Sequence, residues 1–210
     1  MGGGLYHSGL DSSRSIFIHV PKTGGTSIGE ALYGYAAGHH TCAEFRDSNP
    51  NKFHLYFKFS FVRNPWDRLV SAYFHLKSES GVPINVAWFR DNLSKYRDFE
   101  HFVHEGLSSP NVSSWVHFRP QVDFITDSVG KVLVDFVGHF EDIQIDFSHV
   151  AQRVGIRNSL PWANKSCHEH YISYYSDDTR EIVRQFYQKD VEVLGYDFSG
   201  RIANSKILMP

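Results

Sequence analysis

The sequence has few of the residues that build disulfide scaffolds and metal centres. Its 210 residues contain two cysteines, Cys42 and Cys167, which leave one disulfide open but exclude a disulfide-rich scaffold and a cysteine-rich zinc site. Histidine is abundant, but the H-E-x-x-H pattern of zinc hydrolases is absent, and the spacing in His168-Glu169-His170 is too tight to match it. We therefore predict that the protein has no metal site and requires no metal.

The sequence also lacks long apolar runs and a strong net charge. No run approaches the roughly 18 residues of a membrane span, and the N-terminus has no signal-peptide core, so we predict no integral membrane segment. The net charge of −2 argues against a nucleic-acid partner, so anionic ligands must be met by local positive charge. We expect residues 1–14 to form a flexible tail and residues 15–210 to form a single domain.

Stretches of strand character alternate with helical patterns along the chain. The predicted strands cover residues 16–20, 55–62 and 132–137. The predicted helices cover residues 43–47, 64–77, 99–107, 141–154 and 177–194, and residues 47–51 are predicted to form a loop. This alternation predicts a three-layer α/β fold with a central parallel sheet flanked by helices.

The first predicted strand leads through a glycine turn into a helix start. Helix N-termini present unpaired amides that bind phosphate, and glycines let the backbone approach a ligand closely. A lysine and three hydroxyl side chains lie in the same turn, so we predict an anion-binding loop rather than an ordinary capped strand–helix turn. Its predicted ligand-binding residues are Lys22, Thr23, Gly24, Gly25, Thr26 and Ser27.

This loop differs from the Walker A pattern of nucleotide-dependent kinases and NTPases. In that pattern the lysine follows the last glycine, whereas Lys22 precedes both glycines here. A P-loop-type kinase or NTPase also needs a strand-end aspartate for Mg²⁺, for which Asp135 is the only candidate. Such an enzyme and a non-catalytic nucleotide-binding module are the alternatives to the function inferred below.

A second anion motif follows the strand at 55–62. Arg63 lies at the strand end, Asn64 is suited to cap a helix, and Pro65 suits its first position. Ser71 lies roughly 9 Å further along that helix, within reach of an anion bound by a long arginine side chain. Because the arginine fork binds phosphate through two bonds, we predict that Arg63 and Ser71 share an anion; the alternative for Arg63 is a surface ion pair.

The two motifs resemble those of sulfotransferases that use 3′-phosphoadenosine 5′-phosphosulfate (PAPS). Val-Pro-Lys-Thr-Gly-Gly-Thr-Ser at 20–27 resembles their 5′-phosphosulfate loop, and Arg63-Asn64-Pro65 with Ser71 resembles their 3′-phosphate motif. The resemblance implies a P-loop-like fold, PAPS as donor and 3′-phosphoadenosine 5′-phosphate (PAP) as product. It also implies sulfation of a hydroxyl-bearing acceptor, which we expect to be a glycan or glycolipid.

A third segment resembles the base motif of the uronyl and related carbohydrate sulfotransferases. Gly38-His39-His40-Thr41 matches their Gly-His-x-Ser/Thr pattern, with His39 at the position of the base and His40 at the variable one. Histidine suits this role near neutral pH. The predicted catalytic residues are therefore His39, His40 and Lys22. Glu44 is a weaker candidate, and the alternative is a pair of solvent-exposed loop histidines.

Looser similarity to the family covers residues 17–198. Residues 115–121 resemble a His-x-x-Pro-Gln element, which makes His117, Arg119 and Gln121 candidates for acceptor binding or for a structural polar cluster. Asn164-Lys165-Ser166 resembles a loop over the donor, so Lys165 and Ser166 are predicted to bind it. Animal members of this type are usually Golgi-anchored; without an anchor, this chain resembles a bacterial cytoplasmic member or a trimmed Golgi-lumen catalytic domain.

Overall fold

The computed structural model describes residues 4–78, 82–160 and 169–201. These residues form two compact units. The first unit contains residues 4–63 and 121–160, and the second contains residues 64–120 and 169–201 apart from the gap at 79–81. The predicted division into a tail and one domain starting at residue 15 stays a prediction.

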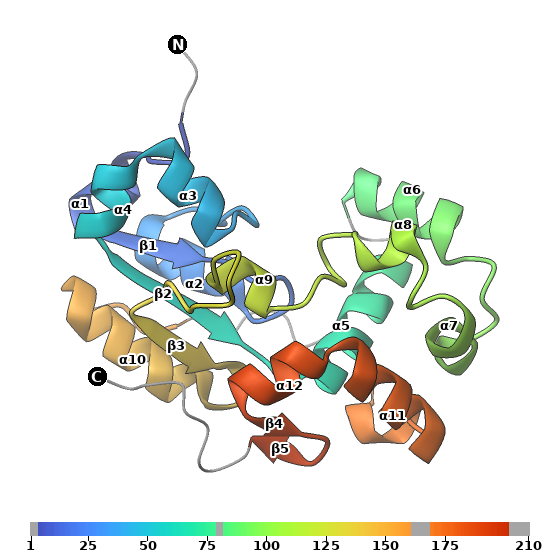
Figure 1. Cartoon of the computed structure of the whole chain (residues 1–210). Coiled ribbons are helices and arrows are strands. Elements are labelled where there is room, and N and C mark those ends of the chain that lie inside the picture. Colours follow the sequence, from blue (N-terminus) through green and yellow to red (C-terminus); the bar gives the residue numbers. More distant parts are fainter. Residues whose placement is uncertain (1–3, 79–81, 161–168, 202–210) are drawn as a thin grey trace. The chain divides into compact units, whose positions relative to one another are not determined.

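The first unit is built around a parallel three-stranded sheet in the order β1-β2-β3 (Figure 1). The strands are β1 (Ser15–Ile18), β2 (Phe57–Val62) and β3 (Phe136–His139). The other elements of this unit are α1 (Ser8–Ser13), α2 (Gly25–Tyr33), α3 (Cys42–Ser48), α4 (Pro50–Leu55), α9 (Val122–Ile125), the 3-10 turn Phe140–Asp142 and α10 (Ile143–Val154). The predicted α/β fold with a central parallel sheet is confirmed.

Helices cover both faces of this sheet. Alternate strand residues point to opposite faces, so Phe17, Phe59 and Phe61 share one face, where they form a core with α2 and α10. The Phe17 and Phe59 rings stack across the two strands at 5.2 Å. On the opposite face the Lys58 ammonium lies over the ring of Phe53 from α4. Burial on both faces is typical of parallel sheets. Each large apolar side chain that is fully buried stabilises the folded state by roughly 1.5–3 kcal/mol.

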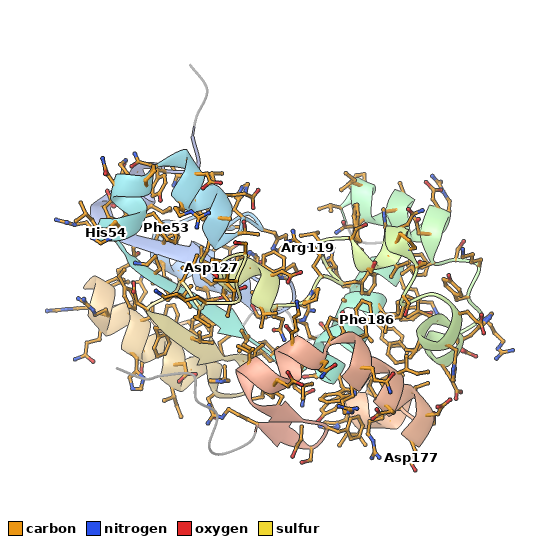
Figure 2. All side chains as sticks on the ribbon, viewed as in Figure 1. Phe53, His54, Arg119, Asp127, Asp177 and Phe186 are labelled. Atoms are coloured by element: carbon orange, nitrogen blue, oxygen red, sulfur yellow. The ribbon has the colours of Figure 1, made fainter. Side chains whose placement is uncertain are left out.

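The second unit is helical and has an aromatic core. Its elements are α5 (Pro65–Lys77), α6 (Pro83–Asn92), α7 (Phe99–Glu105), α8 (Pro110–Ser113), the 3-10 turn Tyr171–Tyr174, α11 (Asp177–Phe186), α12 (Gln188–Leu194), β4 (Tyr196–Asp197) and β5 (Gly200–Arg201). Tyr73 stacks on Phe102 at 5.2 Å, and Phe102 packs against Phe118 at 5.5 Å. Asp177 and Phe186, labelled in Figure 2, mark the first and last residues of α11.

The predicted loop at 47–51 is wrong. Helix α3 continues to Ser48, and α4 begins at Pro50. Asn49 between them caps α4, because its side-chain oxygen accepts a hydrogen bond from the Lys52 amide at 3.0 Å. An Asn-Pro pair is both a turn signal and a helix-start signal, and here it starts a helix.

Two other predicted elements differ from the structure. Within the stretch predicted as a strand at 132–137, only the last two residues belong to β3; Leu133 instead donates its amide to the Ile125 carbonyl. The predicted helix at 177–194 is divided at Tyr187, which lies between α11 and α12 in a non-helical conformation. Tyr187 is 1% exposed and its hydroxyl donates to the Phe118 carbonyl at 2.7 Å, so tertiary packing overrides the helical pattern.

Part of the segment predicted to be a flexible tail is folded. Residues 8–13 form α1, whose Leu10 is buried. The Asp11 carboxylate of this helix accepts hydrogen bonds from the Lys52 ammonium at 2.7 Å and from the Tyr56 hydroxyl at 2.8 Å. A buried leucine and a three-residue polar contact therefore hold α1 against the region around α4.

Candidate functional site

The β1–α2 loop, residues 19–24, makes a tight turn between the strand and helix α2. Lys22 and Gly24 both have left-handed backbone conformations, with φ of 70° and 80°. The Thr23 hydroxyl closes the turn by donating to the Val20 carbonyl at 2.8 Å. Helix α2 has no side-chain cap, so the amides of its first turn are left for another hydrogen-bond acceptor.

Lys22 is the cation of this loop. The left-handed backbone conformation of Lys22 costs roughly 1–2 kcal/mol of folding free energy, because it places the Cβ atom too close to the following carbonyl oxygen. Burial, and then the nearby charge of Arg63, lowers the pKa of the Lys22 ammonium from 10.5 to about 8. Within the part of the chain that the structure describes, no carboxylate pairs with this ammonium. Two neighbouring cations beside uncapped helix amides favour an anion as ligand.

The three hydroxyl residues of the loop are placed differently. Thr23 is fully buried and its hydroxyl is used within the turn. Thr26 is exposed and Ser27 is 7% exposed, both in the first turn of α2. The structure therefore leaves Thr26 and Ser27 as the side-chain donors nearest the helix start, while the Thr23 side chain has a structural role.

Arg63 follows β2 and is 6% exposed. Its Nη1 donates to the Lys22 carbonyl at 3.2 Å, and its guanidinium lies 4.2 Å from the centre of the Phe140 ring. The β1–α2 loop and the end of β2 are thus joined through Arg63. Because parallel strands end at the same edge of a sheet, this edge gathers the positive charge that the sequence predicted.

Gln121, a candidate for acceptor binding or for a structural polar cluster, contacts Arg63. Its exposed fraction is zero, and both ends of its side-chain amide bind the Arg63 backbone. The structure gives the amide an internal partner, in agreement with the structural alternative, and its role in acceptor binding stays a prediction.

The other predicted acceptor residues and Ser71 belong to the second unit. Ser71 lies on α5 and is buried, as is His117, while Arg119 is half-buried (labelled in Figure 2). The fully buried Arg68 donates to the carbonyls of His117 at 3.2 Å and Arg119 at 2.7 Å, which fixes the backbone of this segment.

Lys165 and Ser166 lie outside the described residues, as does Cys167.

The two candidate base residues have different surroundings. His39 is half-buried, and its Nδ1–H donates to the His19 carbonyl at 3.1 Å. A carbonyl only accepts, so the neutral His39 ring carries its lone pair on Nε2. Burial lowers the pKa of His39, opposed by the His19 carbonyl, and the Lys22 and His40 charges lower it further. His40 instead lies 3.6 Å from the Glu44 carboxylate, which accepts a hydrogen bond from the amide of Thr41, the residue that caps α3.

His19 is a site residue that the sequence did not single out. Its Nδ1–H donates to the Ala37 carbonyl at 2.7 Å, and its ring lies 4.2 Å from the His39 ring. Burial lowers its pKa to about 3, so it is neutral near pH 7. A Cβ on Gly25 would collide with the His19 ring, so glycine at this position lets the ring pack beneath the start of α2. A lone histidine at a strand end gives no sequence signal for this role.

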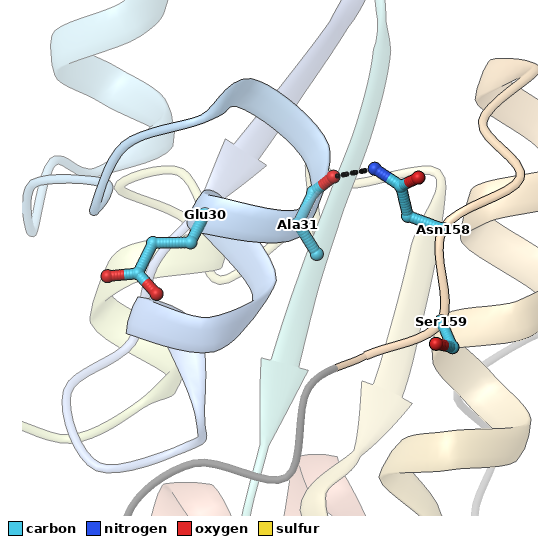
Figure 3. Close-up of a pocket in the computed structure, with 4 residues that line it drawn as sticks. All are labelled: Glu30, Ala31, Asn158 and Ser159. Atoms are coloured by element: carbon cyan, nitrogen blue, oxygen red, sulfur yellow. Dashed lines mark hydrogen bonds between the residues drawn. The ribbon is translucent and has the colours of Figure 1, made fainter.

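A shallow cavity of about 330 Å³ lies at the other end of α2 (Figure 3). Glu30 and Ala31 of α2 line it together with Asn158 and Ser159, and the Asn158 amide donates to the Ala31 carbonyl at 3.1 Å. The Glu30 carboxylate would repel a phosphate, so this cavity does not match the donor chemistry. Among the described residues, no group of three His, Cys, Asp or Glu side chains is placed to hold a metal ion.

Comparisons with known proteins give one family match and two relatives. A model of the sulfotransferase family matches residues 11–197. Carbohydrate sulfotransferase 10 of Gallus gallus is 25% identical over 239 aligned positions, which cover 89% of this chain and 65% of that protein. An uncharacterized protein of Archaeoglobus fulgidus is 29% identical over 107 residues, covering 50% of this chain and 72% of that protein.

No solved structure matches this chain. Within the described residues, no helix combines the length and apolarity needed to cross a membrane. The family match covers the β1–α2 loop, Arg63 and both candidate base residues, and it extends over most of the chain. The chain therefore belongs to the sulfotransferase family.

Proposed function

We propose that this protein transfers a sulfuryl group from PAPS to a hydroxyl of a carbohydrate acceptor. The observation that carries the proposal is the Lys22 ammonium, which lies without a carboxylate partner among the described residues, near Arg63 and the uncapped start of α2. This arrangement suits a ligand with several negative charges. PAPS has such charges at its 5′-phosphosulfate and at its 3′-phosphate.

The two ends of the donor are assigned to two groups of residues. The 5′-phosphosulfate is bound by Lys22, by the amides of residues 24–27 and by the Thr26 and Ser27 hydroxyls. The 3′-phosphate is bound by Arg63, while Ser71, the other residue of the predicted motif, belongs to the second unit. The fixed backbone dipoles of the first group need little rearrangement on binding, which makes them effective at stabilising charge that develops during the reaction.

His39 is assigned as the base. Its Nε2 removes the proton of the acceptor hydroxyl while the hydroxyl oxygen forms a bond to the donor sulfur. The bond between that sulfur and the bridging phosphate oxygen breaks, and PAP leaves with the electron pair. The Lys22 ammonium stabilises the negative charge on the leaving oxygen, so the step needs no metal in this mechanism.

A glycan or glycolipid is the proposed acceptor. Support comes from the similarity to a relative named carbohydrate sulfotransferase 10, although the chain spans only 65% of that protein's length. The Gly-His-x-Thr segment at 38–41 also matches the base pattern of carbohydrate enzymes.

Transfer of labelled sulfate tests the proposal. PAPS labelled with ³⁵S is incubated with the protein and a panel of glycans, glycolipids, phenols and small alcohols, with Lys22→Met as the inactive control. We expect label on a sugar hydroxyl, unaffected by EDTA. Transfer only to phenols would contradict the carbohydrate acceptor. Phosphate transfer from ATP that requires Mg²⁺ would support the kinase alternative instead.

A further inference from the structure

Arg63 is held through its backbone by the side chain of Gln121. The Arg63 amide donates to Gln121 Oε1 at 2.9 Å, and Gln121 Nε2 donates to the Arg63 carbonyl at 2.8 Å. From this contact we infer that Gln121 is a positioning residue that gives the protein its selectivity for a 3′-phosphorylated nucleotide. The inference rests on the proposed function, in which Arg63 binds that phosphate.

The position of Arg63 explains why such a contact is needed. The parallel pairing of β2 with β3 ends at Val62 and His139, so Arg63 lies just beyond the last paired residue of its strand. Arg63 is 6% exposed, and a buried amide or carbonyl without a partner costs about 1–3 kcal/mol. The Gln121 amide, which has one donor group and one acceptor, satisfies both backbone groups at once in place of a neighbouring strand.

Gln121 is itself held in a fixed place. It precedes α9, whose Val122, Phe124 and Ile125 are all buried. The Leu133 amide donates to the Ile125 carbonyl at 2.8 Å, and α9 packs against α3. The packing of α9 therefore holds Gln121 in place, and the Gln121 amide in turn holds the Arg63 backbone.

The guanidinium of Arg63 is directed by a separate pair of contacts. It donates to the Lys22 carbonyl at 3.2 Å and lies over the Phe140 ring at 4.2 Å. Gln121 fixes the base of the side chain, while these two residues fix its tip. An arginine restrained at both ends loses less conformational freedom when it binds a phosphate, which increases affinity and geometric selectivity.

Calorimetric titration of two nucleotides tests this role. PAP and AMP differ in the 3′-phosphate alone, so the ratio of their dissociation constants isolates the contribution of that phosphate. We expect the wild type to bind PAP about 10- to 100-fold more tightly than AMP, the value of one or two charge-assisted hydrogen bonds. Gln121→Met should reduce this ratio about tenfold and leave the AMP affinity within about twofold. Gln152→Leu, an exposed glutamine of α10, is the matched control and should leave both affinities unchanged.

A second variant keeps the test informative if Gln121→Met fails to fold. Gln121→Asn keeps the amide but shortens its reach, so it should fold more readily and still reduce the ratio. A melting temperature measured for each variant separates loss of stability from loss of selectivity. In the double variant Arg63→Ala/Gln121→Asn, the ratio should equal that of Arg63→Ala alone, because both substitutions act through one contact to the phosphate.

The possible outcomes distinguish the inference from the proposed function. A folded Gln121→Asn protein that keeps the wild-type ratio would overturn the positioning role and leave the donor assignment intact. A wild-type protein that binds AMP as tightly as PAP would overturn the donor assignment, and the positioning role with it. Additive effects in the double variant would show that Gln121 acts on selectivity by a route other than Arg63.

Discussion

Buried polar side chains bind main-chain carbonyls in both units, but in the first unit they also lie beside a cation that has no carboxylate partner among the described residues. In the first unit, His19 and Arg63 follow adjacent parallel strands, and the Lys22 ammonium beside them has no carboxylate partner among the described residues. In the second unit, buried donors bind main-chain carbonyls: Arg68 binds those of His117 and Arg119, and the Tyr187 hydroxyl binds that of Phe118. The first arrangement favours an external anion, whereas the second stabilises the backbone.

Because of this difference, we expect substitutions in the two units to have different effects. Substitutions at the strand ends of the first unit should change donor binding or turnover with little loss of stability. Substitutions in the aromatic core of the second unit should lower the free energy of unfolding, and substitutions of its predicted acceptor residues should change acceptor binding alone. The following variants test that separation, starting with the largest expected effect.

Removal of the proposed base should have the largest effect. His39→Ala is expected to lower kcat by about 10²–10⁴-fold, the usual contribution of general-base catalysis, while PAP affinity changes little. His40→Ala is the matched control, since His40 contacts the exposed carboxylate of Glu44. If the loss follows His40 instead, the base assignment is wrong by one residue.

The pH profile sharpens the same assignment. The base works when neutral, and burial lowers the pKa of His39, so kcat/KM should rise with pH through a value below 6.5. It should fall again as Lys22 loses its proton near pH 8. Bound donor favours the charged ammonium, so the alkaline limb of kcat should lie at higher pH than that of kcat/KM. An acid limb that remains in His39→Ala would exclude His39.

A core substitution in the second unit should affect stability alone. Phe102 is fully buried and stacks on Tyr73, so Phe102→Ala should lower the free energy of unfolding by about 3–5 kcal/mol in urea denaturation. Ile84→Ala, at an exposed position of α6, is the control and should change this free energy by no more than about 0.5 kcal/mol. A large loss of PAP affinity in folded Phe102→Ala would break the proposed separation between the units.

Lys22→Met should lower kcat by about 10²–10³-fold, the usual cost of removing one group that stabilises developing charge. The protein should remain folded, because the ammonium has no ion pair among the described residues to lose. Steady-state kinetics with Lys77→Met, a lysine at the end of α5, provide the control. An equal effect of both variants would show that general positive charge, and not the loop, binds the donor.

Arg119→Ala should have the smallest effect. The variant keeps the carbonyl that Arg68 binds, so the fold should be preserved. Loss of one charge-assisted hydrogen bond predicts an acceptor KM about tenfold higher with unchanged PAP affinity. Arg90→Ala, an exposed residue of α6, is the matched control. An unchanged acceptor KM would leave Arg119 with a structural role.

Local motifs made parts of both units predictable. The strand, glycine loop and helix of residues 15–33 lie where the sequence placed them, and Asn64 caps α5 by accepting a hydrogen bond from the Trp66 amide. In both cases the signal lies within a few neighbouring residues, because caps and tight turns are local interactions.

Contacts between distant residues were not predictable. Gln121 and Arg63 are 58 residues apart, and Phe140 reaches Arg63 from beyond β3. The role of His19 depends on the loop that returns to it at Ala37. In the second unit, the helical pattern at 177–194 is broken at Tyr187 by packing that no local residue specifies. Single-sequence patterns therefore identified the two motifs that we predict to bind anions but did not predict which distant residues contact them.

Calorimetric titration with PAP, AMP and ATP tests the central claim most directly, namely that the strand ends of the first unit bind the nucleotide of PAPS. PAP should bind more tightly than AMP and ATP without added metal, and Arg63→Ala should reduce its affinity about 10- to 100-fold. Tighter binding of ATP than of PAP, or PAP affinity unchanged by Arg63→Ala, would contradict the account.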